Sequence, residues 1–329
     1  MNLKYTFLTI GLLLSVGLIG CSSSAENKGD GSGPDKITLD YAHYSPTSLV
    51  LKEKGFAEEA FEEEGTEIEY VLSQGSNKAL EFLNSSSVDF GSTAGAAALM
   101  AKDNGSPIES VYLYSQPEWT ALVSSKDSGI ESVEDLKGKK VAATTGTDPY
   151  IFLVRALKEH GMSIDDIELV NLQHADGASS LNSGSVDAWA GLDPHMAREE
   201  LGSDANLFYR EPSFNTYGTL NVRSDFAEEH PEAVEKVIEA YEEARKWTEE
   251  NPEEAAQILA EEANIDPEVA EIQMERNDFS QPIPGDDLKE SINGAGKVLQ
   301  EEEIIDADSD VEELTDELIN PSFAENVIE

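Results

Sequence analysis

Cysteine is nearly absent from this chain. Cys21 is the only cysteine among 329 residues, so an internal disulfide bond and a metal site built on cysteine are both excluded. Histidine is also scarce, with five residues. The sequence lacks the Gly-x-Ser-x-Gly elbow, the His-Glu-x-x-His pair, the P-loop and the Rossmann glycine fingerprint. These absences predict a protein that is not an enzyme and that uses no metal ion or cofactor.

Basic residues are the second shortage. Lysine and arginine number 22 against 67 aspartates and glutamates, which gives a formal net charge of −45. A chain this acidic repels nucleic acid and anionic lipid, so we expect no nucleic-acid partner. Hydrophobic residues still make up 39% of the chain, and in residues 232–263 they recur at the intervals of an amphipathic helix. The acidic surface suits high salt or alkaline surroundings, because salt screens like charges.

Long apolar runs are missing apart from one at the start. Residues 7–19 are mostly apolar and follow Lys4, but a membrane span needs about 20 residues. We therefore predict a lipoprotein signal peptide over residues 1–20, with an uncleaved anchor as the alternative. The ending "LIGC" resembles the bacterial lipobox, in which the cysteine, here Cys21, is lipidated. Residues 21–35 read as a flexible tether, and the expected location is the extracytoplasmic face of the cell membrane.

One short phrase occurs twice. The sequence "LNSSSVDFGST" begins at Leu83, and "LNSGSVDAWAG" begins 98 residues later at Leu181. Solenoid repeats run to roughly 20–50 residues, so this period is closer to the size of a small domain. Strand and helix patterns alternate around both copies, which predicts mostly parallel sheets covered by helices. Each copy would be a helix end, a turn and a strand start in an α/β half-protein.

The loops after the two repeated strands are the candidate ligand contacts. They are residues 91–95 and residues 191–195. In open α/β sheets, ligands bind outside the carboxyl ends of the strands. Two such sheets facing each other would place both loops in one cleft. The repeat therefore predicts a two-lobed clamp.

A family resemblance is dense over residues 130–200, within which residues 132–195 read "SVEDLKGKKVAATTGTDPY…VDAWAGLDPH". This segment, with "VDFGST" and "LINPSFAENV", is similar to the aliphatic sulfonate-binding proteins of bacterial ABC importers and their taurine- and nitrate-binding relatives. The resemblance implies a type II periplasmic-binding-protein fold, with two α/β lobes joined by two crossing strands and the ligand cleft between them. Lobe 1 would comprise residues 36–123 and 222–329, and lobe 2 residues 124–221. It also implies an ABC permease and an ATPase as partners.

Two helix starts suit a sulfonate, because the helix dipole and the first backbone N–H groups both attract an anion. The resemblance places both in ligand-contacting segments. The first start contains Ser92, Thr93 and Ala94, and the second contains Thr145, Gly146, Thr147 and Asp148. Ordinary helix capping is the alternative interpretation of the hydroxyl residues.

Other candidate contacts come from the remaining loops. His43 and Tyr44 follow the first strand, and Trp119 and Tyr217 lie at the expected crossings. The last two are Asp193, in an Asp-Pro turn, and His195, at a position where the family commonly has an aromatic residue. For each of these residues a purely structural role is the alternative, whether hydrogen bonding, hinge packing or turn formation.

The ligand itself stays open between several chemistries. Asp148 would compete with an anion for the same helix start, which makes a zwitterion such as taurine, or a neutral thiamine-precursor pyrimidine, an alternative to a simple sulfonate or nitrate. We favour the simple alkanesulfonate. An adhesion or sensor lipoprotein is the competing class of function, and an enzyme is the third.

Overall fold

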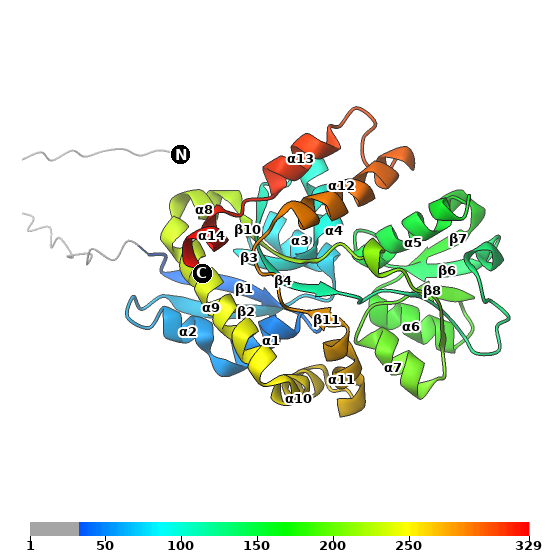
Figure 1. The fold of residues 1–329 in the computed structure, drawn as a ribbon, viewed down its shortest axis with the longest axis horizontal. Coiled ribbons are helices and arrows are strands. Elements are labelled where there is room, and N and C mark those ends of the chain that lie inside the picture. The colour runs from blue at the N-terminus through cyan, green and yellow to red at the C-terminus, as the bar shows by residue number, and fades with distance from the viewer. Residues whose placement is uncertain (1–32, 329) are drawn as a thin grey trace, which may run out of the picture. The chain divides into compact units, whose positions relative to one another are not determined.

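The computed structural model describes residues 33–328. The predicted signal peptide, Cys21 and the tether up to residue 32 lie outside the described residues. Within residues 33–328 no helix is both long enough and apolar enough to cross a membrane. The described part folds as one compact unit with two β-sheets, each flanked by helices (Figure 1).

The first sheet has six strands in the order β11-β4-β10-β3-β1-β2. Strand β1 lies parallel to both β2 and β3, whereas β10 is antiparallel to β3 and to β4. The strand bounds are β1 Lys36–Tyr41, β2 Glu67–Leu72, β3 Phe90–Ala94, β4 Ile108–Pro117, β10 Gly218–Arg223 and β11 Asn277–Asp278.

The second sheet repeats this pattern with five strands in the order β7-β6-β8-β5-β9. Strand β6 is parallel to β7 and β8, and β5 is antiparallel to β8. The bounds are β5 Leu122–Ser124, β6 Lys140–Ala143, β7 Glu168–Asn171, β8 Ala188–Ala190 and β9 Asn206–Tyr209. The repeated phrases end helices α3 (Ser76–Asn84) and α6 (His174–Asn182) and lead into β3 and β8. The prediction that both copies occupy equivalent places is confirmed.

Helices cover both sheets, and the long C-terminal ones pack on the first. Helix α9 packs against α1, α2 and α14, and α12 packs against α4, α13 and also α5 of the other half. The remaining helix bounds are α1 Pro46–Lys54, α2 Phe56–Ala60, α4 Gly95–Asp103, α5 Asp148–Glu159, α7 His195–Gly202, α8 Ser224–Glu229, α9 Pro231–Glu250, α10 Pro252–Ala263, α11 Pro267–Glu275, α12 Asp286–Glu301, α13 Val311–Leu318 and α14 Ser322–Val327.

Two segments carry the chain between the sheets. The chain leaves β4 at Pro117 and enters the second sheet at Leu122; it returns to the first sheet at Gly218. The segments are joined directly, because the Thr120 N–H donates to Asn215 Oδ1 at 3.1 Å. We call the elements around the first sheet the first lobe and residues 122–214 the second lobe. The chain therefore passes from one sheet to the other a few residues before each predicted lobe boundary, at 123 and 221. The predicted lobe boundaries stay a prediction.

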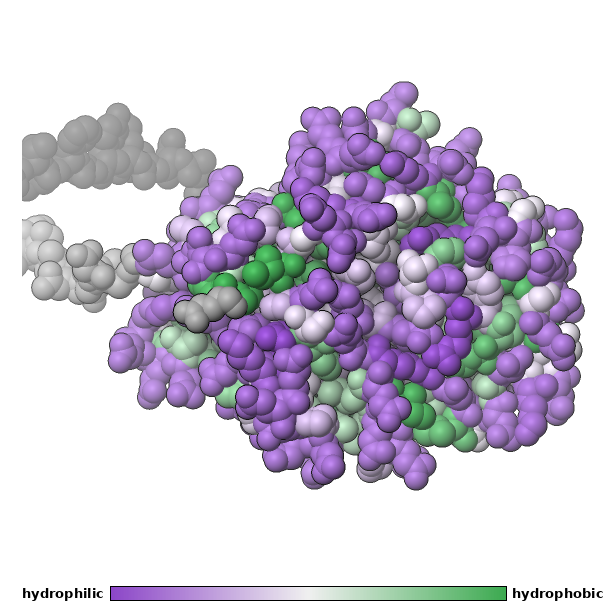
Figure 2. All heavy atoms as spheres, in the orientation of Figure 1, coloured by the Kyte–Doolittle hydropathy of each residue, from purple (hydrophilic) through white to green (hydrophobic). Residues whose placement is uncertain are grey.

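The surface is acidic and poor in exposed apolar side chains. On the face shown in Figure 2, hydrophilic residues cover most of the helices. Among the described residues, Leu201 is the one large hydrophobic side chain that is clearly exposed, at 45%. The apolar residues predicted from the helical periodicity of α9 do point inward, with Val234, Val237 and Ile238 fully buried.

Candidate ligand-binding cleft

A cavity of about 360 Å³ lies where the two lobes face each other. Its walls come from loops at the carboxyl ends of β1, β2, β7 and β8 and from the helices that follow them. This is the edge of an α/β sheet at which ligands bind. The lining residues are His43, Tyr44, Leu72, Ser73, Gln74, Gln173, His174, Ala175, Asp176, Leu192, Asp193, Pro194, His195 and Ala263.

A narrower cavity of about 10 Å³ adjoins it and shares Tyr44 and Leu192 with it. Of these two adjoining cavities, we call the one of about 360 Å³ the larger cavity and the other the narrow cavity. Its other lining residues are Ser76, Trp119, Thr147, Asp148 and Pro149. Here the start of α3, from the first lobe, meets the start of α5, from the second. The first N–H groups of a helix have no acceptor within that helix, and the helix dipole adds positive potential. Two converging helix starts therefore give this place a positive potential, which attracts an anion.

The carboxylate of Asp148 is occupied by protein donors. Its Oδ2 accepts from Trp119 Nε1 at 2.8 Å and from the Thr216 N–H at 3.0 Å, and its Oδ1 accepts from Thr216 Oγ1 at 2.5 Å. Burial raises the pKa of Asp148, and these hydrogen bonds partly offset the rise. Asp148 thus joins α5 to both crossing segments. Its hydrogen-bonding capacity is largely used by the protein itself.

The first predicted helix start, at Ser92, Thr93 and Ala94, lies behind the cleft and lines neither cavity. The crossing segment covers the start of α4: the Gly95 N–H donates to Thr216 O at 2.7 Å, and the Ala96 N–H donates to Thr216 Oγ1 at 3.0 Å. Thr93 is fully buried and packs its hydroxyl against Thr219 in β10. The helix start that reaches the cleft from the first lobe is α3.

Two aromatic residues wall the narrow cavity. Tyr44 and Trp119 pack edge to face, with ring centroids 5.9 Å apart and planes at 84°. Both are almost fully buried, and Tyr44 donates its hydroxyl to Ser92 O at 2.8 Å. Each ring is therefore fixed by a hydrogen bond at its polar end and offers its apolar surface to the cavity.

The loop before α5 positions Thr147 but does not bring all of its neighbours to the cavity. Thr147 donates its hydroxyl to Thr144 O at 2.6 Å, so it does not cap α5 through its side chain. The Thr145 N–H donates to Asn171 Oδ1 at 3.1 Å. Gly146 adopts a φ of +78°, and a Cβ built there would lie 3.6 Å from Cβ of Asn77 in α3. The left-handed turn at Gly146 thus lies against the first lobe.

Asp193 joins the lobes instead of presenting a free carboxylate. Both of its oxygens accept from Nη1 of Arg276, at 3.0 and 3.1 Å, and Oδ1 also accepts from the Ala197 N–H. Arg276 follows α11 in the first lobe, and its Nη2 reaches Glu200 in α7 at 2.5 Å. Burial raises the pKa of Asp193 to about 6, although Arg276 opposes the rise. This ion-pair cluster crosses the cleft.

Three of the five histidines in the sequence line the larger cavity: His43, His174 and His195. Burial is the main cause of a lowered pKa in all three. The pKa falls to about 3 for His174 and to about 4 for His195. All three are therefore neutral at pH 7. His174 also touches the first lobe, since a Cβ built on Gly75 would lie 2.9 Å from its Nε2.

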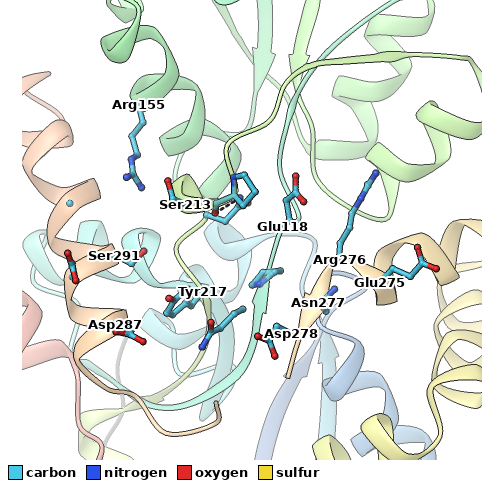
Figure 3. A pocket seen from close by; sticks show the side chains of 16 residues that line it. Glu118, Arg155, Ser213, Tyr217, Glu275, Arg276, Asn277, Asp278, Asp287 and Ser291 are labelled. Atoms are coloured by element: carbon cyan, nitrogen blue, oxygen red, sulfur yellow. Dashed lines mark hydrogen bonds between the residues drawn. The ribbon is translucent and has the colours of Figure 1, made fainter. Parts of the chain in front are cut away.

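Tyr217 is the one predicted contact that lines a different cavity. That cavity, of about 720 Å³, opens between the crossing segments, α12 and the segment around β11 (Figure 3). Arg155, Arg276, Asp278 and Asp287 line it together with Tyr217. Its wall mixes charges of both signs, and none of the predicted residues other than Tyr217 reaches it.

Several cleft residues did not come from the sequence interpretation. Among them are Ser73, Gln74, Ser76, Gln173, His174, Asp176 and Leu192, which line the cavities, and Arg276, which pairs with Asp193. A signal for most of them existed, because "SQGSN" and "LQHAD" follow the strands that flank the first strand of each half. No local pattern pointed to Arg276, which lies 83 residues from its partner Asp193.

These features define a two-lobed binding protein. The type II periplasmic-binding-protein fold is confirmed by solved structures, among them the alkanesulfonate-binding protein of Xanthomonas axonopodis pv. citri bound to MOPS. It superposes with a TM-score of 0.80 at 22% identity, over 88% of this chain and 99% of that one.

The chain belongs to the NMT1/THI5-like family, which matches residues 46–255. A protein of Bacillus subtilis (strain 168) named for binding aliphatic sulfonates is 29% identical, over 93% of this chain and 94% of its own length. A similarly named protein of Escherichia coli (strain K12) is 27% identical over 70% of this chain and 72% of its own length. The predicted family resemblance is confirmed.

Proposed function

We propose that this chain is the extracytoplasmic substrate-binding lipoprotein of an ABC importer, and that it captures a small aliphatic sulfonate between its lobes and delivers it to a permease. The observation that carries the proposal is the narrow cavity, where the starts of α3 and α5 meet beside Tyr44 and Trp119. The sulfonate group would lie at the helix starts, and the organic part would extend past the rings toward the larger cavity.

The ligand test is a thermal-shift and calorimetric screen of the protein lacking residues 1–32, against ethanesulfonate, taurine, nitrate and a pyrimidine. A ligand at a hundred times its Kd stabilises the folded state by about 2.7 kcal/mol. We expect a sulfonate to give this shift and to be recovered unchanged. Stabilisation by nitrate or the pyrimidine alone would contradict the proposed ligand class. Chemical conversion of the ligand would contradict the binding role.

A matched pair of variants locates the anion. Ser76→Asp places a carboxylate at the narrow cavity, and we expect it to abolish sulfonate binding. Ser179→Asp adds the same charge on an exposed position of α6 that lines neither cavity, and we expect it to bind normally. Equal binding by the two variants would remove the helix starts as the anion site.

The membrane attachment is tested separately at Cys21. Cys21→Ala removes the only thiol that a lipid can modify, so we expect the protein to appear in the soluble fraction. Sulfonate binding by the released protein should be unchanged, because the cleft is built from residues 43–276. Retention of the variant in the membrane fraction would contradict the lipid anchor and leave the ligand proposal intact.

A further inference from the structure

Unpaired polar atoms gather in the larger cavity. Gln173 Oε1, His174 Nε2 and His195 Nδ1 belong to residues that line it, and within residues 33–328 none of these atoms has a hydrogen-bond partner. The Ser73 hydroxyl instead lies toward Asp40 and partly offsets the rise that burial causes in the pKa of that carboxyl. His174 is 2% exposed. A buried polar atom left without a partner costs roughly 1–3 kcal/mol. A ligand group that forms hydrogen bonds with these atoms would offset this cost.

The proton on His174 can be assigned from its neighbours. Thr144 donates its single hydroxyl proton to Leu172 O at 2.7 Å. The contact of 3.2 Å between Thr144 Oγ1 and His174 Nδ1 must then have the ring N–H as donor. In the neutral ring, the other nitrogen, Nε2, carries a lone pair and acts as an acceptor. His174 thus presents an acceptor at the place where α3 and α6 approach each other.

The charges that line the larger cavity limit which chemical group of a ligand can bind there. No lysine or arginine is among its lining residues in the described part of the chain, which include the carboxylates Asp176 and Asp193. Asp193 is already paired with Arg276. A second anionic group on the ligand would find no cation here, and a plain alkyl chain would leave the polar atoms unpaired. A hydrogen-bond donor on the ligand needs no cation in the cavity and would pair with the polar atoms.

We infer that the organic end of the sulfonate carries a hydroxyl or ammonium group, which donates to His174 and its polar neighbours in the larger cavity. This inference rests on the proposed function and names the substrate class within it: short alkanesulfonates with a donor at the end opposite the sulfonate. His174 acts as the specificity-determining acceptor, and Gln173 and His195 complete the polar wall.

Three ligands of matched size test the inference on the protein as it folds. They are ethanesulfonate, 2-hydroxyethanesulfonate and 2-aminoethanesulfonate, titrated calorimetrically at neutral pH. We expect at least about a fivefold tighter Kd for one or both of the donor-bearing ligands than for ethanesulfonate, since one added hydrogen bond is of that order. Comparison of the last two ligands distinguishes a hydroxyl from an ammonium group.

His174→Phe removes the acceptor and keeps a ring. We expect it to bring the three Kd values within about twofold of one another, mainly by weakening the donor-bearing ligands, while His230→Phe, remote from the cavity lining, keeps the original differences. If His174→Phe does not fold, the order of the three Kd values in the unmodified protein still tests the inference. Tightest binding of ethanesulfonate, or preserved preference in His174→Phe, overturns the inference and leaves the proposed function standing. Failure of all three ligands to bind overturns the proposed function itself.

Discussion

At the scale of single residues, Asp148 shows how a predicted contact can have a different task. From the sequence alone, its carboxylate would either compete with the anion or pair with an amine on the ligand. In the structure, Trp119 and Thr216 direct three donors at it. Its capacity to accept hydrogen bonds is used in joining α5 to the crossing segments. The charge of Asp148 therefore says little about the charge of the ligand.

Asp148→Asn tests this role. The amide has one acceptor oxygen, and its NH₂ would face a donor from Trp119 or Thr216, so at least one hydrogen bond is lost. We expect the free energy of unfolding to fall by about 1–3 kcal/mol, measured by denaturant titration. Asp165→Asn, on an exposed residue of the same lobe, is the control and should be near neutral. A free energy of unfolding equal to that of the control would show that the hydrogen bonds to Asp148 do not stabilise the crossing segments.

His174 makes a second prediction, on acid stability. Its pKa is about 3 in the folded protein and about 6.5 unfolded, so below neutral pH the unfolded state takes up the proton first. Stability from this residue is complete above pH 6.5 and is lost as the pH falls toward 3. His174→Phe removes the effect, and between pH 7 and pH 4 it should lose about 3 kcal/mol less than the original protein.

The original protein and His174→Phe must be compared because other buried groups change the stability with pH in the opposite direction. Asp40 and Asp193 have folded pKa values of about 6, raised mainly by burial. Their stability contribution therefore rises as the pH falls from 6 toward 4. They are present in both proteins and cancel in the difference. Identical pH profiles for the two proteins would refute the buried, neutral state of His174.

At the scale of elements, the sequence carried the repeat but not the way the helix starts are used. The alternation around Leu83 and Leu181 was enough to place α3, β3, α6 and β8, because local periodicity decides which segments become helix or strand. It could not show that Thr216 would cover the start of α4. That contact joins residues 120 positions apart, and hydrophobic patterning contains no information on such pairs.

Gly75 tests the approach of α3 to α6. A Cβ at this residue would lie 2.9 Å from His174 Nε2 and 2.9 Å from Asn77 Oδ1, tighter than van der Waals contact allows. We expect Gly75→Ala to hold the lobes slightly apart and to weaken sulfonate binding at least about tenfold, a cost of about 1.4 kcal/mol. The control is Gly202→Ala, where a Cβ meets nothing within 4 Å. Equal affinities for the two variants would show that the lobes tolerate separation here.

The cluster around Arg276 links α11 to α7 across the cleft. Arg276 and Asp193 are both nearly inaccessible to solvent, and breaking a buried ion pair by removing one partner costs about 3–5 kcal/mol. Part of this cost falls on the contact between the lobes, so we expect Arg276→Gln to weaken sulfonate binding at least about tenfold in calorimetry. Lys126→Gln, which breaks an exposed pair with Asp204 within one lobe, should leave the affinity unchanged. Unaltered binding by Arg276→Gln would show that the pair does not contribute to closure.

At the scale of the whole molecule, two sheets of the same design are joined so that their carboxyl edges face one cleft. In each sheet three parallel strands are followed by an antiparallel strand that arrives from the other lobe, β10 in the first and β5 in the second. Strand β10 is thus an inner strand of the first sheet, and β5 is an inner strand of the second. If one lobe moves relative to the other, the backbone must change conformation in the short segments around Trp119 and Thr216. Trp119 and Thr216 in those segments donate hydrogen bonds to Asp148, which lines the narrow cavity. The crossing segments and the narrow cavity are thus directly connected.

The net charge of −45 leads to the last prediction, a rise in stability with salt. In α9, Glu239, Glu243 and Glu250 are exposed at intervals of four and seven residues, so three carboxylates lie along one face with Lys246 as the one exposed cation between them. The Debye length shrinks from about 10 Å at 0.1 M to about 3 Å at 1 M salt, which removes most of this repulsion. The exposed ion pairs are weakened too, but each is worth only about 0–1 kcal/mol.

We therefore expect the Tm to rise between about 0.05 M and 1 M sodium chloride, measured by calorimetry. The triple variant Glu239→Gln, Glu243→Gln, Glu250→Gln should be more stable at low salt and should show a smaller rise, because part of the repulsion is gone before salt is added. Lys102→Gln, which increases the negative charge, should show a larger one. A Tm that stays flat or falls with salt in the original protein would contradict a salt-adapted surface, and identical slopes for all three proteins would show that the stabilisation has a source other than screening.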